Sequence, residues 1–425
     1  MSQKIPEILK KIKFNNLQFS HIAYALNEDE YKKFHTFEND IYLSVDAMGS
    51  TLSTMNFTVK DIFNTYLFAT EMGSEKWKGF NSGNNARCIT KLLWRGANLV
   101  GKTVTSEFAV HEETSAVNPW NSNKTVGTSS AGAAVNILID GCDFALATQT
   151  AGSIGRPASY CGVKAFKPTY GMISRTGVLK TCDPFDTVGY FVKDFDVAEK
   201  VSKALFEVGK NYPLNDPRVA REFKKIGVLK HSAVMNDKDV DDRFARLIDE
   251  LSHDFEIETL DIPSEFENIH DQQALIYSYS LSYYFARELT DSESVSESFK
   301  QTVDFARSVS SADFMDALEL HAKHIDKFSK WLTSANVDVV LAPSAFGVAP
   351  NRSGKEERDM NLFYTYMHLP IAYFPMWFNE KKRLPHGLSF IANLKDDYNL
   401  LSFMKTIESK YPVNEGHLYN ENAGV

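Results

Sequence analysis

Apolar and polar positions alternate along most of the chain in a pattern that predicts strands and helices taking turns. Short apolar runs predict strands at residues 97–101, 144–148, 187–192, 226–229, 255–260, 337–341 and 388–392. Segments with helical spacing of apolar positions predict helices at residues 130–140, 196–206, 241–253 and 398–411. This alternation indicates an α/β fold, in which helices cover a sheet.

Two segments depart from this alternation. Residues 3–36 are polar with a broad apolar stripe, which predicts an N-terminal helical segment within residues 1–40. Residues 271–333 contain three helical segments and no strand signal, so we expect a helical insertion over one side of the sheet. No Gly/Pro/Ser-rich linker divides the chain, and we therefore predict a single domain over residues 1–425, with the polar loop at 343–359 lining a rim.

Composition places the chain among soluble globular proteins. It has 425 residues, 43% hydrophobic and 24% charged, with a net charge of −9. That charge argues against a nucleic-acid groove as the main surface. The N-terminus lacks the apolar core of a signal peptide, and no uncharged apolar run is long enough to span a membrane. We expect a cytoplasmic protein, monomer or homodimer, without a nucleic-acid or membrane partner; an organelle stays open.

Neither the cysteines nor the histidines predict a metal site. Cys88, Cys142, Cys161 and Cys182 form no CxxC pair, which favours reduced, buried thiols. His321 and His324 lie three residues apart in a helical segment without an HExxH carboxylate, so we interpret them as ordinary helix residues rather than zinc ligands.

One motif points to a different class of protein. Residues 96–103, GANLVGKT, match the phosphate-loop pattern GxxxxGKT. A phosphate loop follows a strand and opens a helix, whereas here residues 88–95 read as a helix and residues 97–100 as a strand. A nucleotide-binding protein therefore remains only as an alternative.

The most informative stretch is residues 126–170, which holds two serines in clusters of small residues. The first cluster is GTSSAG around Ser129, and the second is TAGSIG around Ser153. Small residues let a carbonyl approach the backbone, whose N–H groups can then stabilise an oxyanion. The second cluster is one residue short of GxSxG, but no apolar strand runs straight into its serine. With no plausible His nearby, the clusters predict acyl transfer with another base.

A neutral lysine is one such base, because a serine hydroxyl is a weak nucleophile that needs a proton acceptor. The candidate is Lys60 in FTVKDI, where apolar neighbours suggest the end of a buried strand. The local residues alone leave open a surface lysine paired with Asp61. Since a free lysine has a pKa near ~10.4, a neutral Lys60 at pH 7 would need strong burial, and activity would rise towards alkaline pH.

Together these motifs resemble the amidase signature family over roughly residues 45–410. The matching segments are Val59-Lys60-Asp61, the GANLVGKT segment with Glu107-Phe108-Ala109, the GTSSAG block, Thr150–Ser153 with Arg156-Pro157-Ala158, and Cys161 through Gly171. The spacings Lys60–Ser129 and Ser129–Ser153 also suit the family. The resemblance accounts for the phosphate-loop match, because that segment corresponds to a strand and turn of the family.

The resemblance implies a fold, an activity and residue roles. The fold would be a large mixed β-sheet sandwiched by helices, and the activity hydrolysis of a small-molecule amide through an acyl-enzyme, without cofactor or metal. Ser153 would be the nucleophile, Ser129 the proton relay after a cis peptide bond from Thr128, and Lys60 the base. Thr150, Ala151 and Gly152, with Ser153, would form the oxyanion hole, and Ser130 would orient Lys60. The glutaminase subunit of a tRNA-dependent amidotransferase, which shares this fold and triad, is the alternative.

Three residues depart from the family pattern near these positions. Thr128 and Ala131 stand in the first serine block and Ala151 in the second, each where glycine is usual in the family. The added side chains remove no atom of the triad. We expect them to narrow the pocket.

Overall fold

The computed structural model describes residues 4–33, 51–207, 221–230, 236–290, 295–352, 354, 357 and 359–413. Its eleven strands lie in one sheet, in the order β1-β3-β2-β4-β6-β5-β10-β11-β9-β7-β8. In chain order they are β1 (Ile22–Ala25), β2 (Asn56–Lys60), β3 (Asn98–Thr103), β4 (Phe144–Gln149), β5 (Lys164–Lys167), β6 (Thr187–Val192), β7 (Lys225–Lys230), β8 (Glu256–Asp261), β9 (Val339–Pro343), β10 (Ile371–Asn379) and β11 (Leu384–Ile391).

The sheet is mixed, and its parallel part holds the lysine strand. β2 pairs in parallel with β3 on one side and β4 on the other. The strands β4, β6, β5, β10, β11 and β9 then follow one another in antiparallel pairs, and β9, β7 and β8 are parallel again. All residues of β2, β3 and β4 are buried, as expected for strands covered on both faces.

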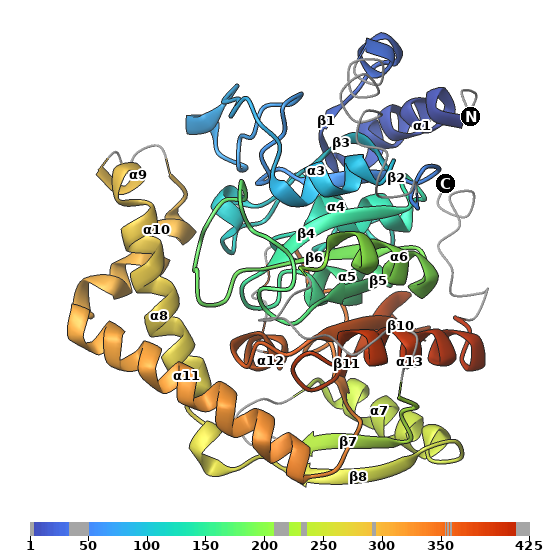
Figure 1. Ribbon diagram of the computed structural model, residues 1–425, viewed down its shortest axis with the longest axis vertical. Coiled ribbons are helices and arrows are strands. Elements are labelled where there is room, and N and C mark those ends of the chain that lie inside the picture. Colours follow the sequence, from blue (N-terminus) through green and yellow to red (C-terminus); the bar gives the residue numbers. More distant parts are fainter. Residues whose placement is uncertain are drawn as a thin grey trace.

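Helices cover this sheet on both faces (Figure 1). On one face α4 packs against α5 and β4; on the other, α6 packs against α3 and α13. The helices outside the insertion are α1 (Lys4–Phe19), α3 (Arg87–Trp94), α4 (Ala131–Leu138), α5 (Gly155–Cys161), α6 (Phe195–Leu205), α7 (Lys238–Leu251), α12 (Asn361–Tyr366) and α13 (Asp397–Lys410), with 3₁₀ turns η1 (Glu75–Trp77), η2 (Glu107–Ala109) and η3 (Ser264–Phe266).

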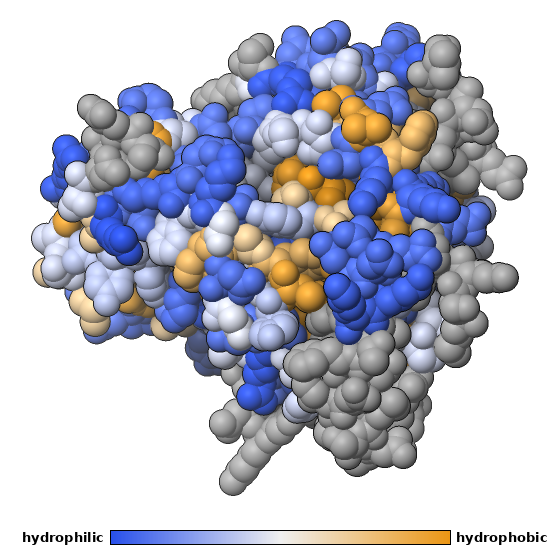
Figure 2. Space-filling view, turned by 90° about the horizontal axis from the view of Figure 1, so that it is seen from above, coloured by the Kyte–Doolittle hydropathy of each residue, from blue (hydrophilic) through white to orange (hydrophobic). Residues whose placement is uncertain are grey.

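The expected helical insertion lies between β8 and β9 and forms a separate layer beside the sheet (Figure 1). Its elements are α8 (Ile269–Tyr284), α9 (Ala286–Thr290), α10 (Glu297–Asp304), η5 (Phe305–Ser308) and α11 (Ser311–Ser334). α8 packs against α11, α10 and α12, so the layer is joined to the segment that follows β9. Viewed from above, hydrophobic residues gather towards the middle of the face, with polar residues around them (Figure 2).

The alternation of apolar and polar residues predicted most of these elements correctly. Each of the seven expected strands and four expected helices is present, with bounds shifted by a few residues. The interpretation of residues 3–36 as helical was wrong in one place, because Ile22–Ala25 forms the edge strand β1 and pairs antiparallel with β3. Pairing with a neighbouring strand, which local periodicity does not contain, decides this segment. Residues 34–40 of the expected N-terminal segment lie outside the described ranges.

Besides β1, the strands β5 and β10 were not predicted. β10 contains Pro375, which lacks an N–H and is unfavourable inside a sheet. The register between β10 and β11 shifts between Phe374 and Trp377, so the proline lies at an irregularity in the ladder. No local pattern in the sequence signals this accommodation.

The four cysteines are free and buried, as predicted. Burial raises the pKa of the Cys88 and Cys142 thiols to about 12, and it also raises the pKa of Cys161 and Cys182. None of the helices in the described ranges combines the length and apolar character needed to cross a membrane.

Candidate active site

Lys60 is the last residue of β2, in the parallel part of the sheet. Its side chain has no exposed surface. The Nζ atom donates hydrogen bonds to Ser129 Oγ at 2.6 Å, Ser130 Oγ at 3.1 Å and Thr148 Oγ1 at 3.4 Å. The structure thus brings three predicted site residues together, and adds Thr148, which sequence reasoning missed.

Burial disfavours the charged form of this amine. It lowers the pKa of Lys60 to about 7, against a smaller opposing effect of the Asp186 carboxylate. All three hydrogen-bond partners are neutral hydroxyls, which can accept from the amine without requiring its charge. Lys60 can therefore exist as a neutral amine near pH 7.

Asp61 does not pair with Lys60, so the open alternative of a surface ion pair is wrong. The partner of Asp61 is Lys102, at 2.7 Å, and both side chains are almost fully buried. Lys102 belongs to β3, within the phosphate-loop match, and also donates to Thr70 Oγ1 at 2.8 Å. Since β3 is a buried strand that follows a helix, this segment does not form the strand–loop–helix cradle that binds phosphate.

Ser129 and Ser130 lie in the loop that enters α4. The Thr128–Ser129 peptide bond is cis, as the resemblance implied. The Ser129 carbonyl accepts from Thr105 Oγ1 at 3.2 Å, which fixes the loop against the end of β3. At Gly132 a Cβ atom would lie 2.4 Å from the His21 carbonyl oxygen, so only glycine allows the backbones to pack this closely.

Ser153 lies in the turn between β4 and α5, and Gln149 shapes this turn. The Gln149 Oε1 atom accepts from the backbone N–H groups of Ile154 at 2.8 Å and Gly155 at 3.0 Å. Thr365 Oγ1 donates to the Ala151 carbonyl at 2.8 Å. The turn is therefore held by side chains on both flanks.

The backbone amides of Ala151, Gly152 and Ser153 donate to no acceptor within the described ranges. Thr150 is fixed through its side chain, which donates to Asp186 Oδ1 at 2.7 Å. Ser153 itself is 7% exposed, and among the described residues its hydroxyl has no hydrogen bond, including none to Ser129. The segment presents backbone donors and a free hydroxyl together.

A cavity of about 450 Å³ adjoins both serine segments. Thr128, which precedes Ser129, and Ala151, two residues before Ser153, belong to its lining. Two of the three departures from the family pattern therefore face the cavity, whereas Ala131 is a buried first residue of α4. Arg352, Gly354, Glu357 and Asp359 also line it, so the loop after β9 forms a rim as expected.

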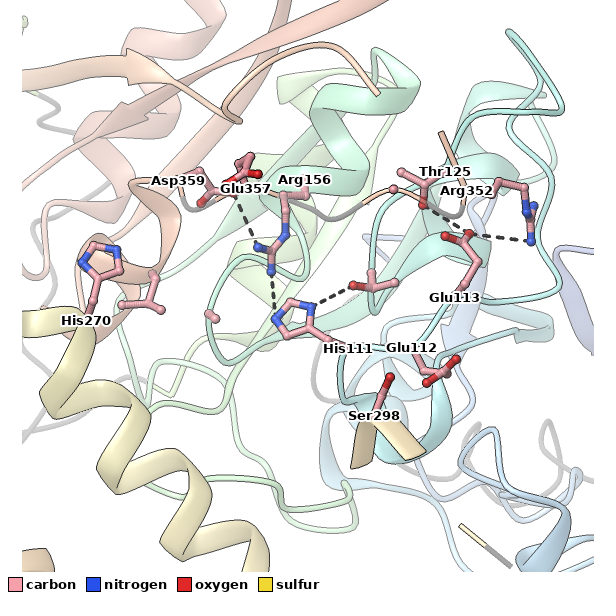
Figure 3. Close-up of a pocket in the computed structure, with 14 residues that line it drawn as sticks. His111, Glu112, Glu113, Thr125, Arg156, His270, Ser298, Arg352, Glu357 and Asp359 are labelled. Carbon is pink, nitrogen blue, oxygen red and sulfur yellow. Dashed lines mark hydrogen bonds and ion pairs between the residues drawn. The ribbon is translucent and has the colours of Figure 1, made fainter. Parts of the chain in front are cut away.

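Polar side chains run along one wall of this cavity (Figure 3). Arg156 Nη1 lies 3.6 Å from Asp359 Oδ2, and Arg156 Nη2 lies 3.3 Å from His111 Nε2. Desolvation of the imidazole ring by the surrounding protein lowers the pKa of His111, and the neighbouring Arg156 cation lowers it further. A neutral His111 accepts from Arg156 through Nε2, so Nδ1 carries the proton and donates to Thr128 Oγ1 at 3.0 Å.

Sequence reasoning did not identify His111 or Asp359, and it treated Arg156 only as a family motif residue. Arg156 lies three positions after Ser153, which was the one available signal. The pair His321 and His324 belongs elsewhere: both rings bond to Tyr366, one to its carbonyl and one to its hydroxyl. No group of three or more His, Cys, Asp or Glu residues in the described ranges is placed to hold a metal ion.

Comparisons with known proteins show the family and the fold. The family model described as Amidase matches residues 7–401. A glutamyl-tRNA(Gln) amidotransferase subunit from Methanosphaera stadtmanae is 26% identical over 392 residues, 83% of this chain and 84% of the relative. The peptide amidase of Stenotrophomonas maltophilia superposes with a TM-score of 0.82 at 19% identity, covering 98% and 95% of the two chains. A further amidase crystal structure gives 0.82 at 22% identity, covering 96% and 95%.

Proposed function

Because the chain belongs to the amidase family, we propose that it hydrolyses a carboxamide C–N bond through an acyl-enzyme on Ser153. The observation that carries this proposal is the buried Lys60 amine, 2.6 Å from the Ser129 hydroxyl with a pKa of about 7. A serine hydrolase without histidine needs such a base, and the pKa of this one lies near neutral pH.

In the first half-reaction the Ser153 oxygen attacks the amide carbon, and its proton passes through Ser129 to Lys60. The hydrogen bond between the two serines has to form as substrate binds. The negative charge on the carbonyl oxygen is stabilised by the backbone amides of Thr150, Ala151, Gly152 and Ser153. Ser130 orients Lys60, and Asp186 holds Thr150 in place.

Collapse of the tetrahedral intermediate breaks the C–N bond. The proton held by Lys60 returns through Ser129 to the leaving nitrogen, which departs as an amine or ammonia. Water then attacks the ester on Ser153, and the same relay accepts its proton. When the bond between the acyl carbon and the Ser153 oxygen breaks, this proton returns through Ser129 to Ser153 and the carboxylic acid is released. Each step uses only groups of this chain, the substrate and water.

Covalent labelling tests the proposal. A fluorophosphonate probe should modify Ser153 alone, as read by mass spectrometry of peptides, and labelling should be lost in Lys60→Ala. Ser159→Ala is the matched control, because Ser159 is a buried serine of α5 whose hydroxyl accepts from the Gly387 N–H; this variant should label normally. Labelling of another serine, or amidase activity that survives Ser153→Ala, would rule the mechanism out.

A second candidate is the glutaminase component of a tRNA-dependent amidotransferase, which would work with a partner protein. The relative from Methanosphaera stadtmanae, matched over 83% of this chain, favours it. Glutaminase activity that appears only when partner proteins are added would support this candidate. Hydrolysis of simple amides by the isolated chain, without partner-dependent stimulation, would favour the free-standing amidase.

A further inference from the structure

Arg156 places a cation beside the proposed nucleophile segment. A Cβ atom built on Gly152 would lie 3.0 Å from Arg156 Cζ, so the guanidinium covers the backbone of this residue. Arg156 also belongs to the cavity lining. A guanidinium with no counter-charge at this position would attract a substrate that carries a carboxylate.

The Asp359 carboxylate lies next to this guanidinium and opposes its charge (Figure 3). The two side chains lie 3.6 Å apart and are only 8% and 3% exposed, so their interaction is less screened than a surface ion pair. Asp359 Oδ1 accepts from the Asn361 N–H at 2.9 Å, which holds the carboxylate in place at the start of α12. Neutral His111 accepts a hydrogen bond from Arg156 Nη2 at 3.3 Å.

The other arginine of the described cavity wall is paired as well. Arg352 lies 3.6 Å from Glu113 and donates to the backbone carbonyls of Thr114 and Ala116. Glu112 and Glu357 add two further carboxylates to the described lining. Among the described lining residues, each arginine therefore has a carboxylate partner that offsets its attraction for a substrate anion.

Resting on the proposed amidase function, we propose that Asp359 is a specificity-determining residue. By neutralising Arg156 it makes the cavity select amides whose acyl group carries no carboxylate. The substrate class is then short neutral or ammonium-bearing acyl amides, and loss of the Asp359 charge converts the same cavity to one that takes ω-carboxy amides.

Three amides of similar size test this: butanamide (neutral), 3-aminopropanamide (cationic) and succinamate (anionic). Their binding is measured by calorimetry on the Ser153→Ala variant, and their kcat/KM on the enzyme with Ser153 intact. Succinamate should be the poorest ligand, by about tenfold. In Asp359→Asn the affinity for succinamate should rise by about tenfold while that for butanamide stays constant.

Two variants separate Asp359 from a general effect of cavity charge. Glu112→Gln removes a lining carboxylate that forms no ion pair with an arginine among the described residues, so the preference should not change. In the double variant Arg156→Met, Asp359→Asn the gain for succinamate should disappear. Arg156→Gln alone, which retains Asp359, should weaken succinamate further and serves as the test if Asp359→Asn does not fold.

The proposal is overturned if succinamate binds as tightly as butanamide to the unaltered cavity, or if none of the three amides binds. It is also overturned if Glu112→Gln reproduces the gain or if the gain persists without Arg156. Binding in the expected order without any hydrolysis would instead contradict the proposed function, because Ser153→Ala measures the cavity independently of turnover.

Discussion

At the scale of single residues, the site depends on keeping two adjacent side chains electrically separate. Lys60 and Asp61 follow each other in the chain, where β2 ends and a turn begins. Asp61 is paired with Lys102, whereas the hydrogen bonds of the Lys60 amine within the described ranges all go to hydroxyls. A carboxylate beside Lys60 would favour the charged amine, so this separation preserves a lysine that can accept a proton.

The lowered pKa of Lys60 predicts how stability depends on pH. Between pH 7 and about 10.5 the unfolded state binds a proton that the folded state does not, so the free energy of unfolding rises with pH across this window. The full change is about 4–5 kcal/mol. We therefore expect chemical denaturation to show that Lys60→Met exceeds wild type in unfolding free energy by the largest amount at pH 7 and below. This difference should shrink towards pH 10. A constant difference across pH would contradict a neutral Lys60 in the folded protein.

The same titration predicts the activity profile. Because the base must be neutral, kcat/KM should rise as pH increases through about 7 and then level off. The rise should remain in His111→Ala, since the pKa of His111 is lowered and the ring is already neutral there. If the rise of kcat/KM with pH disappeared in this variant, the base would be His111 and not Lys60.

At the scale of elements, the positions of the two serine turns depend on close contacts that α4 and α5 make with the sheet. Gln149, at the end of β4, bonds two backbone amides at the start of α5 and also donates to Thr365 and Tyr373. At the entry to α4 the tight feature is Gly132, which lies against the backbone of His21 and Val104. These contacts fix the two serine turns relative to the sheet.

Substitution of Gly132 tests this close approach. Gly132→Ala puts a Cβ within 3.0 Å of three backbone atoms, which cannot move aside as a flexible side chain can. We expect a loss of about 2–3 kcal/mol in unfolding free energy, measured by denaturant titration, and lower activity. Gly347→Ala is the matched control: its Cβ would meet nothing closer than 3.4 Å, and stability should stay within about 0.5 kcal/mol. Equal stability of the two variants would show that α4 can shift.

At the scale of the whole molecule, the sequence predicted what local patterns contain and missed what distant segments create. The central strands and their helices carry clear periodicity, and the two serine blocks carry recognisable motifs. Strand β1 and the irregular β10 depend on their neighbours in the sheet. The Arg156–Asp359 pair joins α5 to the loop before α12, segments that meet only after the sheet has formed, so neither residue signals the other in advance.

The four buried thiols have a consequence for how the molecule can be observed. Thiolate is the reactive form, and in the folded protein it is suppressed at each cysteine by burial. The positions differ: Cys88 lies in α3, Cys142 before β4, Cys161 in α5, and Cys182 beside Ser280 of α8. Alkylation can therefore proceed only through opening of the surrounding structure, and each position reports on its own region. The alkylation rate of each cysteine therefore measures local unfolding of its own region. Cys161, the last residue of α5, reports on the helix that follows Ser153.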